Sequence, residues 1–309
     1  MTKLPQFQEL RQLQFEPTRC PVCQAERFRE KYSKKVQDYS MRYVSCLECG
    51  TLYTNPRLTV ESLKNLYASE LFFEGKEKNY NYYSFLSGEK YLTKTAASRL
   101  MRIMKYAKKG KLLEVASAAG FFLREAKKRG FDVTGIEISA PMAEYVTAQH
   151  GIKVFPKSIE EIELARHEYD VIASWGVFTI LRDPRAVLRK FNQALKPGGC
   201  LALNTYYTGS LWERIFRQNW YILVANMSQI FSQQTLIQCI QESGFELVSR
   251  RRDCPYASIE RLIFGLFSHF PGGVRNRLFE QLKFLNKIII RVPLPDVYEY
   301  ICVKKKEID

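Results

Sequence analysis

The residues whose types and spacing best suit a binding site form a turn of small side chains between an apolar run and a helical run. The segment 111–120 has the sequence KLLEVASAAG. Small residues at such a turn allow the backbone to approach a nucleotide closely. The next apolar run, 132–137, ends at Glu137, where a β-strand would present a carboxylate to ribose hydroxyls. This pattern predicts a nucleotide-binding turn.

The turn departs from the usual G-x-G-x-G pattern. Alanines occupy the first two glycine positions, at Ala116 and Ala118, and only Gly120 is retained. If the backbone has a positive φ there, each added Cβ costs roughly 1 kcal/mol and keeps a ligand farther from the main chain. We therefore expect a cofactor fold with a modified ligand cradle.

Two close cysteine pairs in the first fifty residues have the spacing of a metal site. Cys20 and Cys23 form one C-x-x-C pair, and Cys46 and Cys49, followed by Gly50, form the other. Four thiolates satisfy tetrahedral Zn²⁺ and leave no open position for catalysis. The segment between the pairs has the pattern of a hairpin. We favour a structural zinc ribbon, and a redox-active C-x-x-C pair is the alternative.

The rest of the chain supplies the elements that must position these residues. Apolar runs alternate with helical stretches from residue 111 onward, which predicts an α/β sheet with helices on both faces. A short helix at 59–67, which Thr59 can cap, precedes them. The expected strands are 111–116, 132–137, 152–155, 170–175, 199–205, 245–251 and 297–304.

Composition limits the class of protein. The chain has 46% hydrophobic residues and a formal net charge of +15, which favours anionic partners without choosing among nucleic acid, phospholipid and phosphorylated substrate. It shows no apolar run of eighteen residues and no signal-peptide pattern at its start, so we expect a cytoplasmic location. The remaining cysteines are scattered singly and are expected to be core thiols.

From about residue 80 to the end, the chain resembles the class I S-adenosylmethionine-dependent methyltransferases. The motifs that carry the resemblance occur in the family's order and spacing, and they are 113–123, 133–139, 169–172, 182–188 and 195–199. The resemblance implies a Rossmann-like, seven-stranded sheet whose last two strands are antiparallel. The cysteine pairs, followed by Pro56-Arg57, look like the front end of bacterial sugar and glycan methyltransferases.

This resemblance implies two domains and a functional insert. The expected domains are a zinc ribbon with its linker helix at 1–75 and a methyltransferase domain at 76–309. An insert at about 256–296 precedes the last strand, and its residues 258–290 combine apolar positions at helical spacing with interleaved Arg and Lys. Such a pattern fits either a cap over the acceptor cleft or a peripheral contact with a membrane.

The resemblance also implies where each part of the cofactor binds. Glu114 would lie near the methionine amino group, and the backbone around Ala116, Ser117 and Gly120 would approach the methionine portion.

The remaining implied contacts concern the adenosine portion. Glu137 would bind both ribose hydroxyls, with an exposed charge at a strand end as the alternative. Ile138 would pack on the adenine face, while Ser158 and Ile159 would meet the adenine edge. Core packing is the alternative role for Ile138 and Ile159.

The expected catalytic positions differ from those of sugar-modifying relatives. Those relatives commonly carry a Glu-His pair where this chain has Thr179-Ile180, and a second histidine where it has Met227. The three histidines, at 150, 167 and 269, match no family motif. Methyl transfer from a sulfonium is an in-line displacement that can depend largely on approach and orientation, so these absences do not exclude catalysis.

Tyrosines are the remaining polar candidates near the transfer site, and the catalytic residue is not assigned. Tyr82, Tyr83, Tyr206 and Tyr207 could supply a polar contact or a proton acceptor, or their rings could form a pocket wall.

Three functions follow from these observations. The leading hypothesis is methyl transfer to a sugar, nucleotide-sugar or carrier-linked glycan. The first alternative is an RNA methyltransferase, because a zinc ribbon and a large positive charge also suit a phosphate backbone. The second is a catalytically degenerate relative that acts as a binding or scaffold protein.

Overall fold

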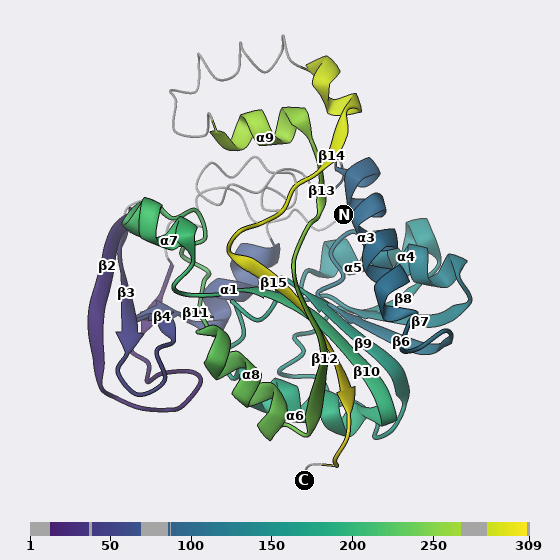
Figure 1. Cartoon of the computed structure of the whole chain (residues 1–309), viewed down its shortest axis with the longest axis horizontal. Helices are drawn as coiled ribbons and strands as arrows, with labels where there is room; N and C mark the ends of the chain where they lie inside the picture. Colours follow the sequence, from purple (N-terminus) through teal and green to yellow (C-terminus); the bar gives the residue numbers. More distant parts are fainter. Residues whose placement is uncertain (1–12, 37–38, 69–85, 87, 267–282, 308–309) are drawn as a thin grey trace.

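The computed structural model describes residues 13–36, 39–68, 86, 88–266 and 283–307. Its central element is a seven-stranded sheet with the order β12-β15-β10-β9-β6-β7-β8 (Figure 1). The strands are β6 (Gly110–Val115), β7 (Phe131–Ile136), β8 (Lys153–Phe155), β9 (Tyr169–Trp175), β10 (Leu195–Tyr206), β12 (Phe245–Arg252) and β15 (Val297–Lys304). Every strand expected from the sequence is present.

The register of the sheet places the carboxyl ends of five parallel strands at one edge. β6 lies between β7 and β9 and pairs in parallel with both. On their other sides, β7 pairs in parallel with β8, and β9 pairs in parallel with β10. β15 pairs antiparallel with both β10 and β12, which confirms the antiparallel pairing of the last two strands. Ligands of open α/β sheets bind outside the carboxyl ends of such strands, so this edge is the expected position of the site.

Helices cover both faces of the sheet, as the alternating pattern predicted. The helices α3 (Glu89–Ile103), α4 (Phe121–Lys128) and α5 (Ala140–His150) pack their apolar residues on one face, and α6 (Pro184–Ala194) and α8 (Gln233–Glu242) pack on the other. Side-chain caps fix two of these helix starts. Asp183 accepts a hydrogen bond from Ala186 N at 2.8 Å, and Ser232 accepts one from Thr235 N at 3.1 Å.

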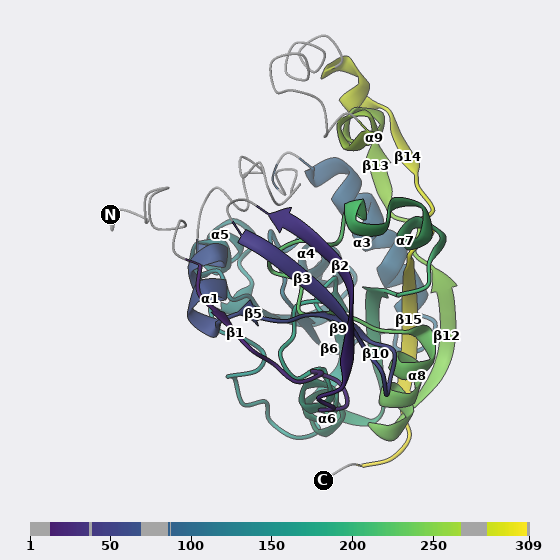
Figure 2. The ribbon, with the colours of Figure 1, turned by 90° about the vertical axis from the view of Figure 1, so that its left-hand side faces the viewer.

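The N-terminal module is a small antiparallel sheet followed by a helix (Figure 2). Its elements are β1 (Phe15–Glu16), β2 (Phe28–Val36), β3 (Tyr39–Cys46), β4 (Leu52–Thr54), β5 (Arg57–Leu58) and α1 (Val60–Ala68). β2 and β3 form the expected hairpin. The helix α1 begins after Thr59, whose hydroxyl accepts a hydrogen bond from Ser62 N at 3.3 Å.

The module is continuous with the larger part of the chain. Its sheet has the order β11-β4-β3-β2, and β11 (Gln229–Ile230) comes from the segment between β10 and β12. Cys20, Val44 and Tyr53 also belong to the same buried cluster as Phe231 and Tyr300. The ribbon therefore shares a sheet and a hydrophobic core with the larger domain, although the domain boundary proposed at 75/76 lies outside the described residues.

The insert before β15 is only partly helical. It contains β13 (Tyr256–Ser258), the helix α9 (Ile259–Leu266), a 3₁₀ helix η3 (Lys283–Lys287) and β14 (Ile289–Arg291). β13 and β14 pair antiparallel, and this unit extends beyond the sheet in both views (Figures 1 and 2). The helical spacing expected up to residue 290 is wrong at its end, because the β-branched Ile289 and Ile290 lie in the strand β14 and pair with β13. Within the described ranges, no helix has the length and apolarity needed to cross a membrane.

Candidate functional site

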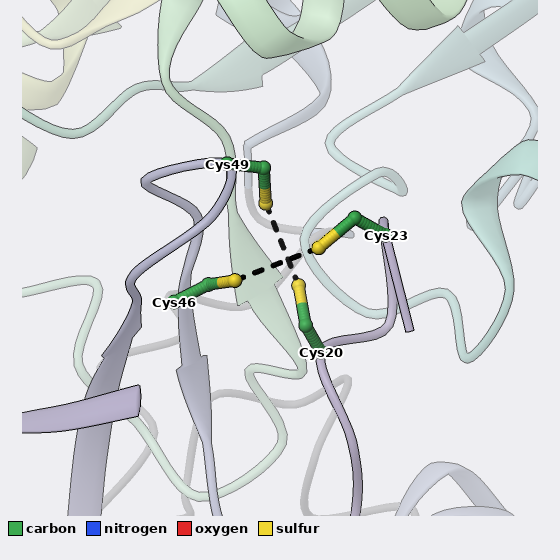
Figure 3. Close-up of side chains that lie close together, drawn as sticks. All are labelled: Cys20, Cys23, Cys46 and Cys49. Carbon is green, nitrogen blue, oxygen red and sulfur yellow. Dashed lines mark hydrogen bonds between the residues drawn. The ribbon is translucent and has the colours of Figure 1, made fainter. Parts of the chain in front are cut away.

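The four predicted metal ligands meet at one point between the β2–β3 hairpin and the preceding loop (Figure 3). The sulfur atoms of Cys20, Cys23, Cys46 and Cys49 all lie within 4.8 Å of one another. The Cys20–Cys49 and Cys23–Cys46 sulfur distances are 3.6 and 3.5 Å. Tetrahedral zinc with bonds of about 2.3 Å requires sulfur separations of about 3.8 Å, so this donor set fits zinc closely.

Two matching backbone turns hold the cysteine pairs. Gln24 N donates to Cys20 O at 2.9 Å, and Gly50 N donates to Cys46 O at 3.1 Å, with Gly50 at φ 71°. A hydrogen bond from Cys20 lowers the pKa of the Cys49 thiol to about 5. Because all four donors are sulfur, the site would serve a structural metal.

The turn after β6 has the backbone conformation that the sequence pattern predicted. Ala116 and Ala118 have φ values of 57° and 44°, and Gly120 has a φ of 72°. Alanine disfavours this region by roughly 1–2 kcal/mol relative to glycine. At Gly120 an added Cβ would lie 2.7 Å from the Val146 side chain, so a larger residue would also clash. The one retained glycine thus occupies the position with the least space.

Glu137 lies directly beside this turn and is buried, so the alternative of an exposed charge is wrong. Its Oε2 accepts a hydrogen bond from Ala118 N at 2.8 Å, and its Oε1 accepts one from Ser139 N at 3.0 Å. Burial raises the pKa of Glu137, while the backbone amides act in the opposite direction. The carboxylate therefore connects the ends of β6 and β7. Its role toward ribose hydroxyls stays a prediction.

Two cavities lie along the carboxyl edge of the sheet and meet at Ala116. The first has a volume of about 300 Å³, is largely apolar, and is lined by Ile138, Ser158 and Ile159 among others. The second has a volume of about 330 Å³ and is lined by residues that include Glu114 and Ser117. The residues predicted for the adenine thus share one cavity. Of the residues predicted for the methionine portion, Glu114, Ala116 and Ser117 line the other. Gly120, which precedes α4, and Glu137 line neither cavity.

The second cavity contains an unusual concentration of buried polar atoms that lack partners. Buried polar groups are nearly always hydrogen-bonded, and an unpaired one costs about 1–3 kcal/mol. Five such atoms, without a hydrogen-bond partner among the described residues, belong to residues lining this cavity. They are Arg99 Nε, Glu114 Oε2, Ser117 Oγ, Trp175 Nε1 and Thr205 Oγ1. This set fits a polar ligand that supplies the missing partners.

A charged network that sequence reasoning missed borders the same cavity. Arg99 on α3 pairs with Asp253 at 2.7 Å, and Asp253 accepts a hydrogen bond from Asn204 Nδ2 at 2.6 Å. Asn204 Oδ1 in turn accepts from Gly176 N at 2.7 Å. Burial raises the pKa of Glu114 well above its usual range, although Arg99 favours the ionised form. An asparagine within the apolar run 199–205 was the one sequence signal for this network.

The remaining candidates divide between the site and the core. Tyr206 lines the second cavity, whereas the Tyr207 hydroxyl donates to Pro295 O at 2.9 Å. Tyr82 and Tyr83 lie outside the described residues, as does His269. His150 and His167 line neither cavity.

Two of the three positions that differ from sugar-modifying relatives are buried, and the third lines a cavity. Thr179 and Met227 are buried, and Ile180 contributes to the wall of the first cavity. Thr179 O accepts hydrogen bonds from the backbone of Ser228 and Gln229, at the start of β11.

A hydroxyl chain leads from Tyr206 to a buried carboxylate. Tyr206 is hydrogen-bonded to Tyr221, with ring centroids 5.8 Å apart. Tyr221 donates to Asp296 Oδ1 at 2.9 Å, and Trp220 Nε1 donates to Asp296 Oδ2 at 2.8 Å.

Comparison with known proteins identifies relatives of the α/β part of the chain. A family model described as a methyltransferase domain matches residues 89–250. The tRNA U34 carboxymethyltransferase of Cellvibrio japonicus is 29% identical over 140 residues, which cover 42% of each chain. The malonyl-[acyl-carrier protein] O-methyltransferase of Pseudescherichia vulneris is 22% identical over 192 residues, covering 60% of this chain and 76% of the relative.

A solved structure of an S-adenosylmethionine-dependent methyltransferase from Archaeoglobus fulgidus is 21% identical, with a TM-score of 0.48, and covers 71% of this chain and 99% of that one. The chain spans less than two thirds of the length of the first of its curated relatives. The ribbon and α1 precede the region that the family model matches.

Proposed function

This chain belongs to the family of proteins with this methyltransferase domain, and on that premise we propose that it binds S-adenosylmethionine and transfers its methyl group to a sugar, nucleotide-sugar or carrier-linked glycan. The observation that carries the proposal is the pairing of an apolar cavity with a cavity of unpaired polar atoms, joined at Ala116. An adenosyl sulfonium also has two unlike ends, a flat heterocycle and a charged amino acid that could use the unpaired polar atoms.

The apolar cavity would hold the adenine. Ile138 and Ile159 supply apolar surface and Ser158 supplies a hydroxyl, all within one cavity. Glu137 stands at the end of β7, beside the turn, where it would accept hydrogen bonds from the ribose hydroxyls. Its existing bonds to two backbone amides keep its carboxylate oriented while leaving further lone pairs for a ligand.

The second cavity, with its unpaired polar atoms, would hold the methionine portion. Glu114 and Arg99 offer an acceptor and a donor without partners, which suits the α-ammonium and α-carboxylate of a zwitterion. Asp253 and Asn204 hold the Arg99 guanidinium in position. The sequence hypothesis of a degenerate, scaffolding relative is disfavoured because a scaffold has no use for this costly set of unpaired groups.

The bound cofactor supplies the methyl group and its sulfonium leaving group. A hydroxyl acceptor must lose its proton as the new bond forms, and the Tyr206 oxygen would receive that proton. Tyr206 then passes its own proton to Tyr221, and Tyr221 passes one to Asp296, which becomes neutral. Because a sulfonium donor would lose its positive charge on transfer, the neutralisation of Asp296 keeps the charges balanced. This relay would replace the histidines that sugar-modifying relatives use.

The acceptor class rests on the resemblance of the cysteine pairs and Pro56-Arg57 to glycan methyltransferases. The insert supports a membrane-attached acceptor, because Ile288 and Ile290 are 46% and 41% exposed. RNA remains the second candidate, because one relative is a tRNA-modifying enzyme. The zinc ribbon would be structural in either case.

The test is transfer of radiolabelled methyl from S-adenosylmethionine to a panel of acceptors. The panel contains nucleotide-sugars, lipid-linked glycans, acyl-carrier-protein thioesters and bulk tRNA. We expect label in a sugar-containing fraction. Label confined to tRNA or to the carrier protein would refute the glycan assignment while retaining the methyltransferase assignment.

A further inference from the structure

One wall of the apolar cavity comes from the N-terminal module and not from the methyltransferase sheet. The helix α1 contributes four residues to the lining, which are Val60, Leu63, Lys64 and Tyr67. Their spacing of i, i+3, i+4 and i+7 places them on one face of the helix. This face lines the same cavity as Ile138 and Ile159. The whole length of α1 is therefore directed at the predicted adenine site.

The start of α1 is fixed beside the cavity by the strand pair β1–β5. Phe15 pairs with Leu58, and Arg182, which lines the cavity, donates through Nη1 to Leu58 O at 3.0 Å. Arg57 Nη1 donates back to Arg182 O at 3.3 Å. The segment that leads into α1 is thus joined by reciprocal hydrogen bonds to Arg182, another residue of the cavity lining.

The middle and end of α1 are also joined to the cavity walls. Lys64 pairs with Glu161 at 2.6 Å, and both residues belong to the lining. Tyr67 is 8% exposed, and its hydroxyl accepts a hydrogen bond from Asn226 Nδ2 at 2.9 Å. Anchors along the helix therefore hold it in one position relative to Ile138 and Ile159.

A second connection runs from the cysteine cluster to another part of the cavity wall. Thr51 O accepts a hydrogen bond from Cys46 N at 2.9 Å, immediately before β4. β4 pairs with β11, where Gln229 Nε2 donates to Phe178 O at 2.6 Å. The adjacent residues Val177 and Ile180 line the cavity. The ribbon is thus connected to the cavity on two sides.

We propose that α1 is part of the cofactor site, with Leu63 and Tyr67 covering adenine on the side opposite Ile138 and Ile159. The ribbon would then set cofactor affinity through α1, in addition to any contact with the acceptor. This inference rests on the proposed function, because it assigns the apolar cavity to adenine. A cavity of about 300 Å³ is at the small end of ligand sites, which suits one heterocycle enclosed on both faces.

The test is calorimetric titration of the whole chain with S-adenosylhomocysteine and, separately, with adenosine. Leu63→Ala removes apolar surface from the cavity side of α1, and we expect it to weaken both ligands by about tenfold. Asn65→Ala is the matched control, because Asn65 lies on the exposed face of the same helix, and we expect unchanged affinity. If Leu63→Ala does not fold, Val60→Ala at a 40% exposed lining position replaces it, with an expected loss of about threefold.

The outcomes separate this inference from the function on which it rests. If the unmodified chain binds neither ligand, the proposed function fails. If the unmodified chain binds but the α1 variants bind as tightly as it does, only the role of α1 is overturned. A loss for S-adenosylhomocysteine without a loss for adenosine would also overturn it, because α1 would then contact a different part of the cofactor.

Discussion

Glu137 Oε2 accepts a hydrogen bond from the backbone amide of Ala118 at 2.8 Å. This bond joins the carboxyl end of β7 to a turn in which two alanines have positive φ values. A positive φ at an alanine needs support from the surrounding structure, and the buried carboxylate provides part of that support. The same carboxylate has the position predicted for ribose binding, so the strained turn and the cofactor site share one residue.

Restoring glycine in the turn should stabilise the protein. We expect Ala116→Gly and Ala118→Gly each to raise the free energy of unfolding by about 1 kcal/mol, because glycine adopts positive φ without the steric cost of a Cβ. Urea denaturation measures the change. The matched control is Ala119→Gly, which is buried and does not have a positive φ, and which should lower stability. A loss of stability in the first two variants would show that the alanine side chains contribute more packing than strain.

Glu137→Gln should destabilise the turn although it preserves the shape of the side chain. Glutamine has one acceptor oxygen, so either Ala118 N or Ser139 N would face an amide that is itself a donor. We expect the free energy of unfolding to fall by about 1–3 kcal/mol. Glu144→Gln on the exposed face of α5 is the control. Equal stability of the two variants would contradict the bracing role of Glu137.

Cofactor binding should release a proton from Glu114. Burial raises the pKa of Glu114, so the folded protein favours the neutral form of this side chain. The neutral form therefore contributes to the free energy of unfolding at low pH, and this contribution is lost as the pH rises through the raised pKa. A cationic ligand favours the carboxylate. Between the usual pKa of 4.5 and the raised value, S-adenosylmethionine should therefore bind more tightly as pH increases.

Calorimetry in buffers of different ionisation enthalpy measures this release. The apparent binding enthalpy should vary with the buffer for the unmodified chain and should not vary for Glu114→Gln. A buffer-independent enthalpy for both proteins would mean that Glu114 does not change protonation on binding.

Sequence reasoning predicted the elements well because their signals are local. The strands of the parallel sheet are near-continuous apolar runs, and two C-x-x-C pairs specify a metal site by spacing alone. The Arg99–Asp253 pair had no comparable signal, since its members are 154 residues apart in sequence. β11 is two residues long, which is too short for a periodic pattern. The cavity face of α1 was equally hidden, because an amphipathic helix does not reveal what it packs against.

Removing the metal should weaken cofactor binding as well as the ribbon. Cys46→Ser removes one of four ligands, and we expect loss of bound zinc measured by elemental mass spectrometry and at least about tenfold weaker binding of S-adenosylhomocysteine. Cys254→Ser is the control, because Cys254 lies outside the cluster. Loss of zinc with unchanged affinity for S-adenosylhomocysteine would show that the ribbon does not influence cofactor binding.

Tyr206→Phe should separate chemistry from binding. It removes the hydroxyl that would receive the acceptor proton, so the transfer rate to the best hydroxyl acceptor of the panel should fall by about a hundredfold or more. Affinity for S-adenosylhomocysteine should change by less than about twofold. Tyr207→Phe, whose hydroxyl bonds to Pro295 O, is the control. Equal rates for the two variants would exclude the relay through Tyr221 and Asp296.

The most direct measurement is calorimetric titration of the whole chain with S-adenosylmethionine, compared with Glu137→Ala. We predict saturable binding of one ligand per chain, weakened by about tenfold or more in the variant. No heat of binding at millimolar ligand would contradict the assignment of the paired cavities to this cofactor, and equal affinity of the two proteins would contradict the role of Glu137 in binding it.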